Sequence, residues 1–200
     1  KQFSEHAWSA IVNVAVEPDG LVRRYPFGQN LDGQYLPSMG AVLAGQFDSV
    51  RPQFLIDYSI RSASVPKVSF IDVLRGDAAT LAGLKGKKVI VGGTAMELGD
   101  RFSIPNGGIV SGPVLQALAA ESIIQNRALR WTSGAVTVLA VGALALIMML
   151  TWRRLSAGTR VVLLVATAFA VEAAAVLLQA MFPLVLDTGL FNIAIAAYIG

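Results

Sequence analysis

The longest apolar stretch of the chain covers residues 133–152, which include no charged residue, no histidine and no proline. A helix of this length would rise about 30 Å, which matches the hydrocarbon core of a bilayer. A helix of a soluble protein normally keeps a polar face, and this stretch has none. The pattern predicts a membrane-spanning helix, and the alternative is a very apolar helical subdomain of a soluble protein.

Two further apolar runs follow, over residues 161–182 and 184–200. The loop between the first two runs, residues 153–160, contains three arginines. Short loops rich in arginine stay on the cytoplasmic side of a membrane. We therefore expect an all-α segment over residues 131–200 with three transmembrane helices, the loop 153–160 in the cytoplasm, and the preceding residues on the outer face of the inner (plasma) membrane.

One charged residue, Glu172, interrupts the second apolar run. A charge in mid-span is costly if it faces lipid, whereas the surrounding alanines favour close helix packing. Two interpretations stay open. Glu172 is either a polar pin or proton-sensitive site at a helix interface, or a protonated acid that is hydrogen-bonded inside the bundle.

The polar half of the chain, residues 1–130, predicts an α/β domain with a mixed sheet and flanking helices. The turn sequence at 17–20, Glu-Pro-Asp-Gly, predicts a hairpin between its flanking runs. Residues 30–35 read as a loop, and the last helix would run almost directly into the first membrane span and link the domain to it. The predicted strands are 10–16, 21–25, 54–60, 68–70 and 89–91, and the predicted helices are 37–47, 71–74 and 113–130.

Two features of this domain could bind a ligand. Arg23 and Arg24 lie on opposite faces of a predicted strand; they form either a solvated edge that discourages aggregation or a site for an anion or an internal carboxylate. Gly92, Gly93 and Thr94 follow the predicted strand 89–91, where glycine lets backbone amides approach a ligand.

The glycine spacing at this strand end is not that of a nucleotide-binding loop, and a tight turn with positive φ is the main alternative. Glu97, Asp100 and Arg101 follow the glycines, as an acid/base or metal cluster or as a simple ion pair in a loop.

The composition excludes several kinds of function. The 200 residues are 54% hydrophobic and 14% charged, with a formal net charge of +3, and the basic residues are not gathered as a nucleic-acid surface would require. There is no cysteine, and the single histidine is His6, so neither a usual metal site nor a nucleophile–base pair is present. We expect no nucleic-acid partner, no catalytic residue, no metal and no cofactor. The chain starts without methionine and ends inside an apolar run, and we interpret it as part of a longer protein.

Several short motifs occur in the order of a known family of receptor domains. The chain resembles the second type of CHASE domain, the cyclase/histidine-kinase-associated sensory extracellular domain, over nearly all of its length. Gln116 stands where family members often carry histidine, and the segment 107–111 replaces a shorter stretch. The matching motifs are DGLVRR at 19–24, YLPS at 35–38, VSFIDVLRG at 68–76, KKVIVGGTA at 87–95, LGD at 98–100, and Pro105.

The resemblance implies an α/β sensor outside the cytoplasm of a bacterial cell, in a receptor with a cytoplasmic output enzyme. That enzyme would be an adenylate or guanylate cyclase, or alternatively a diguanylate cyclase or phosphodiesterase, or a histidine or Ser/Thr kinase. We expect a lipid bilayer around the spans, a homodimer, and an unidentified small-molecule or protein stimulus. A membrane-anchored enzyme and a small transporter subunit are the alternatives from other classes. The expected signal surface consists of Arg23, Arg24, Gly92, Gly93, Thr94 and Asp100.

Overall fold

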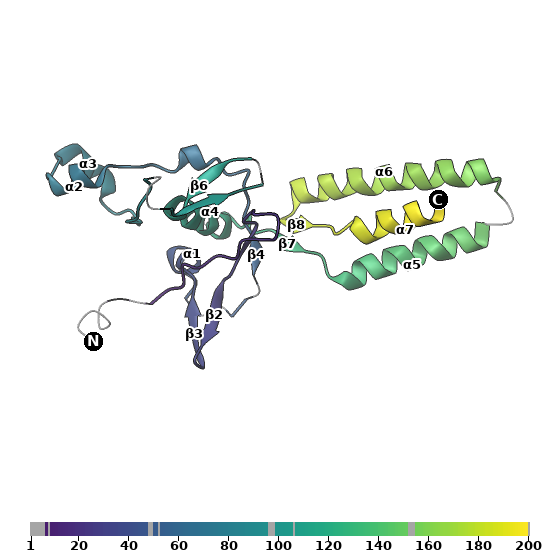
Figure 1. Ribbon diagram of the computed structural model, residues 1–200, viewed down its shortest axis with the longest axis horizontal. Helices are drawn as coiled ribbons and strands as arrows, with labels where there is room; N and C mark the ends of the chain where they lie inside the picture. Colours follow the sequence, from purple (N-terminus) through teal and green to yellow (C-terminus); the bar gives the residue numbers. More distant parts are fainter. Residues whose placement is uncertain are drawn as a thin grey trace. The chain divides into compact units, whose positions relative to one another are not determined.

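A computed structural model describes residues 7, 9–47, 50–51, 53–95, 99–105, 107–151 and 155–199. The chain divides into two compact units, Lys1–Ala128 and Leu129–Gly200. Figure 1 shows strands and helices in the first unit, and mainly helices in the second. The sequence-predicted residues His6, Glu97, Arg153 and Arg154 lie outside the described residues.

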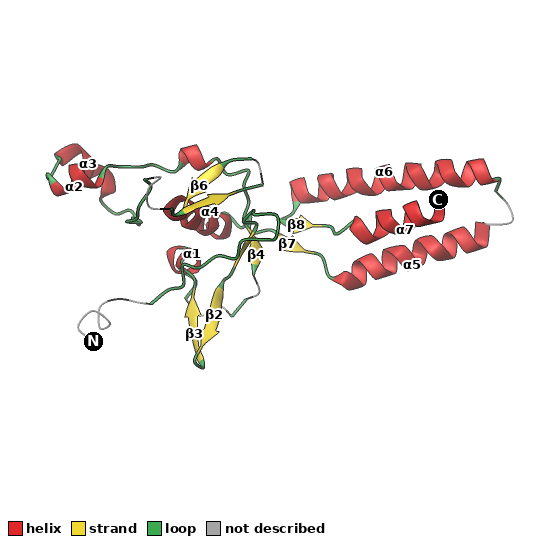
Figure 2. Cartoon of the chain, viewed as in Figure 1, coloured by secondary structure: helices red, strands yellow, loops and turns green. Residues whose placement is uncertain are grey.

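The described part of the first unit holds three antiparallel pairs of strands (Figure 2). The α/β character predicted from the sequence is confirmed, but the strands form separate two-stranded sheets instead of one mixed sheet. The pairs are β1 (Arg24–Tyr25) with β4 (Phe54–Leu55), β2 (Gly28–Leu31) with β3 (Gln34–Pro37), and β5 (Arg101–Ser103) with β6 (Ile109–Ser111).

The helices of the first unit begin and end at local signals in the sequence. The helix α1 follows Ser38, whose hydroxyl accepts a hydrogen bond from the amide of Ala41 at 3.3 Å, and it ends before Gly45, which has a φ of +75°. Ser38 thus acts as the N-cap, and glycine supplies the left-handed residue after the helix. The helices are α1 (Met39–Leu43), α2 (Phe70–Leu74), α3 (Ala78–Leu84) and α4 (Gly112–Ile124), with a short 3₁₀ helix η1 at Ser62–Ser64.

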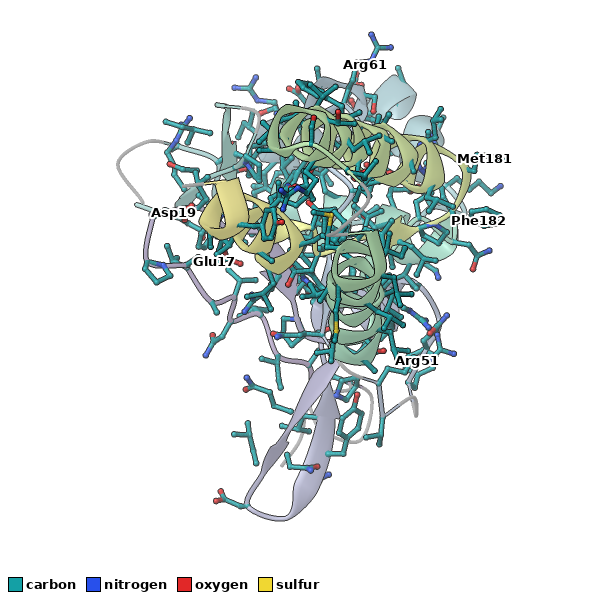
Figure 3. The ribbon with its side chains drawn as sticks, turned by 90° about the vertical axis from the view of Figure 1, so that its right-hand side faces the viewer. Glu17, Asp19, Arg51, Arg61, Met181 and Phe182 are labelled. Carbon is teal, nitrogen blue, oxygen red and sulfur yellow. The ribbon has the colours of Figure 1, made fainter. Side chains whose placement is uncertain are left out.

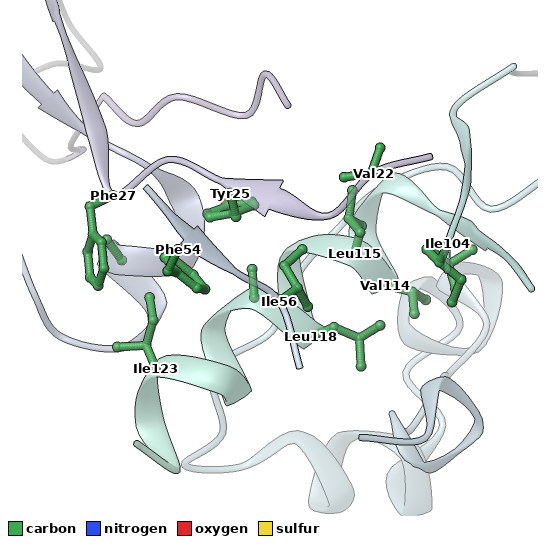
Figure 4. Close-up of a cluster of buried hydrophobic side chains, with 13 residues drawn as sticks. Val22, Tyr25, Phe27, Phe54, Ile56, Ile104, Val114, Leu115, Leu118 and Ile123 are labelled. Atoms are coloured by element: carbon green, nitrogen blue, oxygen red, sulfur yellow. The ribbon is translucent and has the colours of Figure 1, made fainter. Parts of the chain in front are cut away.

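The helix α4 is the centre of the hydrophobic core (Figure 4). Leu115 and Leu118 are completely buried, and they pack with aromatic side chains from the strands. The ring centroids of Phe27 and Phe54 are 4.9 Å apart, and those of Tyr25 and Phe54 are 5.6 Å apart. These tilted contacts are favourable arrangements for aromatic pairs. The first unit is therefore built around one helix that is covered on most of its sides.

The second unit consists of three helices and one short parallel strand pair. Figure 1 shows the helices running alongside one another. Among the described residues, only α6 is long and apolar enough to cross a membrane. The helices are α5 (Gly134–Thr151), α6 (Ala157–Met181) and α7 (Gly189–Ile199), and the strands are β7 (Arg130–Trp131) and β8 (Leu184–Val185).

The predicted hairpin between residues 10–16 and 21–25 is wrong. The turn exists, because the amide of Gly20 donates to the carbonyl of Glu17 at 2.8 Å and Gly20 has a φ of +82°. Beyond it the two arms separate: Ile11 forms an isolated bridge to Ser38, and Leu21 forms one to Ser103. Long-range pairing in the core outweighs the local strand pattern.

The true hairpin lies where a loop was predicted. Strands β2 and β3 are joined by Asp32 and Gly33, whose φ angles are +50° and +80°. Two central residues with positive φ form the turn that best matches the twist of a hairpin, and Asp-Gly is a preferred sequence for it.

Two predicted strands in residues 68–91 are also wrong. Phe70 begins the helix α2, and residues 89–91 form no strand, with Val89 48% and Val91 73% exposed. The predicted helical turn at 71–74 is confirmed, and the predicted helix 37–47 and strand 54–60 are present in shorter form.

The predicted helix 113–130 ends earlier than its sequence pattern indicates. Asn126 has a φ of +54°, its amide donates to Ile123, and the amide of Arg127 donates to Ser122. These two bonds close the helix in a Schellman motif, with asparagine in the position that glycine usually takes. A continuous helix into residue 131 is therefore excluded.

Replacing Leu118 by alanine tests the role of α4. We expect Leu118→Ala to lower the free energy of unfolding by about 2–5 kcal/mol, because it leaves a cavity in the core. Leu81→Ala on α3 is the matched control, since Leu81 is 45% exposed. Denaturant unfolding of the chain in mild detergent, followed by circular dichroism, measures both. Equal effects of the two variants would contradict the central position of α4.

Candidate functional site

The beginning of α4 brings together two of the sequence-predicted site residues. Gly92 lies against the ring of Pro113, so closely that a Cβ atom on Gly92 would be 2.5 Å from Cγ of Pro113. Gly93 is half-buried and Thr94 is exposed in the following loop. Neither Gly92 nor Gly93 has a positive φ, so the predicted left-handed turn is wrong. Glycine is needed here for close packing on the helix start.

Asp100 approaches the same helix start from the other side. Its carbonyl accepts a hydrogen bond from the amide of Gly112 at 3.1 Å. Its carboxylate lies over Gly112, where an added Cβ would be 2.1 Å from Oδ2. A negative charge near the N-terminus of a helix is favoured by the helix dipole. We refer to Gly92, Asp100, Gly112 and Pro113 as the α4 junction.

Arg23 belongs to a different cluster at the turn of residues 17–20. Its guanidinium donates to Oε2 of Glu17 at 2.7 Å and to Oδ2 of Asp19 at 2.6 Å. Both carboxylates lie close together at the turn (Figure 3). Arg23 is thus paired with two carboxylates of this chain.

The electrostatics of this turn are those of a closed ion-pair network. The hydrogen bond from Arg23 holds the pKa of Asp19 below its usual value, and the amide of Leu21 adds to this effect. The same partners, Asp19 first and then Glu17, raise the pKa of Arg23. Arg24 pairs more loosely with Oε1 of Glu17, at 3.5 Å. The network fixes the turn and already neutralises much of the charge of its arginines.

The turn and the α4 junction lie at opposite ends of the strand β5. Val22 donates its amide to the carbonyl of Ser103 at 3.0 Å, at the end of β5, whereas Asp100 precedes its first residue. Three strand residues cover about 10 Å. Among the described residues, no hydrogen bond or ion pair joins Arg23 to Asp100. The sequence-predicted residues thus form two groups, which the strand β5 connects.

The buried polar network around Tyr25 is not predicted from the sequence. The hydroxyl of Tyr25 donates to Oε1 of Gln116 and accepts from the amide of Gly40 at 2.9 Å, while Nε2 of Gln116 donates to the carbonyl of Val12 at 2.9 Å. Burial raises the pKa of Tyr25. Gln116 is only 6% exposed. Its position between apolar residues of the helix is the sequence feature that could have indicated a buried polar contact. It joins three segments that are distant in the sequence.

A second missed cluster holds the other end of α4. Oδ2 of Asp57 pairs with Nε of Arg127 at 2.7 Å, and the amide of Asp57 donates to Oγ of Ser122 at 3.1 Å. Arg127 also donates to Oγ of Ser59 at 2.5 Å. The position of Asp57 within the apolar run 54–60 is the sequence feature that could have indicated this buried contact. We refer to Asp57, Ser59, Ser122 and Arg127 as the Asp57 clamp.

Glu172 makes a polar contact inside the second unit. Its Oε1 accepts a hydrogen bond from Nδ2 of Asn192 at 2.6 Å. The contact joins α6 to α7 and fits both interpretations of Glu172, the polar pin and the hydrogen-bonded acid.

The chemistry that these groups can perform is limited. The described residues contain no group of three or more acidic or histidine side chains that could hold a metal ion. The α4 junction has one carboxylate, and the turn has carboxylates that are already paired.

A comparison with known families identifies the architecture. The family model described as CHASE2 domain matches residues 5–151. This range includes the turn, the α4 junction, the Asp57 clamp and the helix α5. Comparisons with curated proteins and with solved structures found no match.

The α4 junction can be tested by adding a methyl group. We expect Gly112→Ala to lower the free energy of unfolding by about 1–3 kcal/mol, because the new Cβ displaces the carboxylate of Asp100. Asp100→Gly should recover most of this loss in the double variant, because it removes the carboxylate. The control is Gly83→Ala in α3, where nothing lies within 4 Å of the added Cβ. The same unfolding measurement applies, and strict additivity of Gly112→Ala and Asp100→Gly would contradict the contact.

Proposed function

The chain belongs to the CHASE2 domain family, and from this premise we propose that it is the sensory input module of a bacterial transmembrane receptor. CHASE2 domains are extracytoplasmic sensors that are typical of signalling receptors. The family match over residues 5–151 is the observation that carries the proposal. The mixed α/β unit would receive a stimulus, and the helical unit would relay it across the membrane.

The composition of the second unit supports a membrane location. The helix α6 is long and apolar enough to span a bilayer. The helices α5 and α7 are shorter but equally apolar, and many of their large side chains are exposed. Exposed apolar surface of this extent is costly in water and favourable in lipid. We propose that all three helices lie in the inner membrane, with the loop 153–160 in the cytoplasm and the first unit outside. The 11 residues of α7 cover about half of the hydrocarbon core, so this helix is the described part of the third predicted span.

The structure of α4 supports a mechanical relay in the sensor unit. At its beginning the helix contacts Gly92 and Asp100 in the α4 junction, and at its end the Asp57 clamp holds Ser122 and Arg127. Between them the helix is buried on most sides, so it moves as a rigid element. A stimulus that shifts the junction would therefore strain the clamp, next to the chain segment that leads to residue 129.

We propose that the stimulus acts near the loop of Gly92, Gly93 and Thr94 and near Asp100. A stimulus can change the receptor only if it binds one of its two states better than the other. The loop 89–95 is mostly exposed, and so is accessible to a small molecule or a protein. Arg23 and Arg24 follow Val22, whose amide bonds to Ser103 at the end of β5, and we propose that they influence the junction through this strand.

The output enzyme is proposed from the family alone. A nucleotide cyclase is the first choice, and a diguanylate cyclase, a phosphodiesterase or a kinase would use the same input. We propose that the module works as a homodimer, because a helix displacement changes enzyme activity most simply by altering how two catalytic domains meet. The absence of cysteine from the sequence makes both the topology and the dimer accessible to single-cysteine experiments.

Single cysteines test the topology. We expect a membrane-impermeant maleimide to label Ala63→Cys, in the exposed 3₁₀ helix of the first unit, in intact spheroplasts. Ala157→Cys, at the exposed start of α6, should react only after permeabilisation, because the arginine-rich loop keeps it inside. The cysteine-free chain is the control for background labelling. Labelling of Ala157→Cys from outside would reverse the topology and remove the sensor proposal.

Variants of the loop test the signal surface in the full receptor. We expect Gly93→Val and Asp100→Ala to change basal output or its response to stimulus several-fold, because Asp100 contacts the start of α4 and Gly93 follows Gly92, which packs on Pro113. The matched control is Gly83→Ala on α3, which should leave output unchanged. Membrane insertion, measured by the same labelling, should be preserved in all three. Unchanged output in both loop variants under every stimulus tried would contradict this surface.

A further inference from the structure

The three helices of the second unit line a half-open apolar cavity of about 780 Å³. This volume is within the range of pockets that bind small ligands, roughly 300–1,000 Å³. Almost all of the lining is apolar and comes from all three helices. The main lining residues are Val141, Leu144 and Met148 of α5, Leu164 of α6, and Ile195 and Tyr198 of α7.

The depth of the cavity corresponds to one leaflet of a bilayer. On α5 the lining begins at Val141 and ends at Leu150, which is about 13.5 Å along a helix. Half of a hydrocarbon core is about 15 Å. A membrane-spanning helix from another chain would need a groove along the full length of the bundle. A lipid acyl chain that enters from one leaflet needs a groove only as deep as that leaflet, which is the depth of this cavity.

Arg160, a basic residue in the first turn of α6, lies at one end of the cavity. Tyr198 lines the cavity, and its hydroxyl lies 3.4 Å from Nη1 of Arg160, which donates to it. Leu164, one turn after Arg160, also lines the cavity. Arginine near the level of the headgroups attracts anionic lipids, and basic pockets between transmembrane helices on the cytoplasmic side bind acidic headgroups. The position of Arg160 and the depth of the cavity thus both indicate a lipid headgroup at the end of the bundle where α6 begins.

We propose that this cavity is a binding site for an anionic phospholipid of the cytoplasmic leaflet. One acyl chain occupies the space between α5, α6 and α7, and the phosphate lies against the guanidinium of Arg160. A half-open apolar cavity offers few partners to water, so in a bilayer an acyl chain is the occupant that fits its lining. The inference rests on the proposed membrane location of the second unit, and it adds a lipid dependence to the relay.

Native mass spectrometry of the chain, released from mixed micelles, tests the site. The probes are phosphatidylglycerol and phosphatidylcholine with identical acyl chains. We expect the chain to retain phosphatidylglycerol preferentially. Ala145→Phe, which places a ring in the cavity, should reduce the retained lipid by about tenfold. Its control is Ala143→Phe, since Ala143 is exposed and does not line the cavity.

A second pair of variants tests the headgroup contact. Arg160→Gln should reduce the preference for phosphatidylglycerol over phosphatidylcholine by about fivefold. Arg130→Gln is the control, because Arg130 is an exposed arginine in β7, before the opposite end of α5. Circular dichroism verifies that each variant keeps its helices.

The outcomes separate the lipid site from the proposed function. Equal retention of lipid by Ala145→Phe and Ala143→Phe, or no preference for the anionic lipid, would overturn the site while the labelling result still supports a receptor. A loss of dimer in Ala145→Phe without loss of lipid would assign the cavity to a second copy of the chain. Failure of the chain to insert into micelles would remove both proposals.

Discussion

The burial of α4 is the constraint on which the first unit depends. A helix that is covered on most sides has no polar face for solvent, so neighbouring segments must supply both its apolar contacts and its polar partners. Leu115 and Leu118 meet aromatic side chains from three strands, and this packing draws β1 and β4 together although they are some 30 residues apart. Such two-residue strands are too short to be stable alone, and the helix is the surface on which they assemble.

The same burial requires that polar groups inside the core be paired. Gln116 and Ser122 lie on α4 with 6% and 0% exposure, and both use their side chains to reach other segments. Gln116 contacts the hydroxyl of Tyr25 and the carbonyl of Val12, whereas Ser122 accepts from the amide of Asp57. An unpaired group at either place would cost about 1–3 kcal/mol. These bonds therefore specify one arrangement of the segments around the helix, which hydrophobic packing alone would leave more open.

The sequence predicts turns, helix starts and apolar helices better than it predicts which distant segments contact each other. The turn at Gly20 and the start of α1 after Ser38 follow from the properties of single residues, and the long apolar helices follow from length and composition. The hairpin at Asp32 and Gly33 was also readable, but the stronger apolar pattern at residues 10–16 drew the prediction to the wrong turn. Tyr25 and Gln116 are 91 residues apart, and no local pattern indicates that they meet. Of the expected signal surface, Gly92 and Asp100 converge on α4, because both segments pack at its first turn.

The end of α4 is fixed both by side-chain contacts and by the conformation of the backbone. In the first unit the Asp57 clamp fixes the end of α4 with a partly exposed ion pair, and Asn126 closes the helix four residues before β7 begins at Arg130. A helix that continued through this segment would transmit rotation directly, whereas a closed helix followed by extended chain transmits mainly displacement. In the relay that we propose, the Schellman motif at Asn126 would therefore limit the rotation that α4 could pass on. Within the second unit, the contact of Glu172 with Asn192 joins α6 to α7, and in the membrane location that we propose such a pair would help to keep these helices in register.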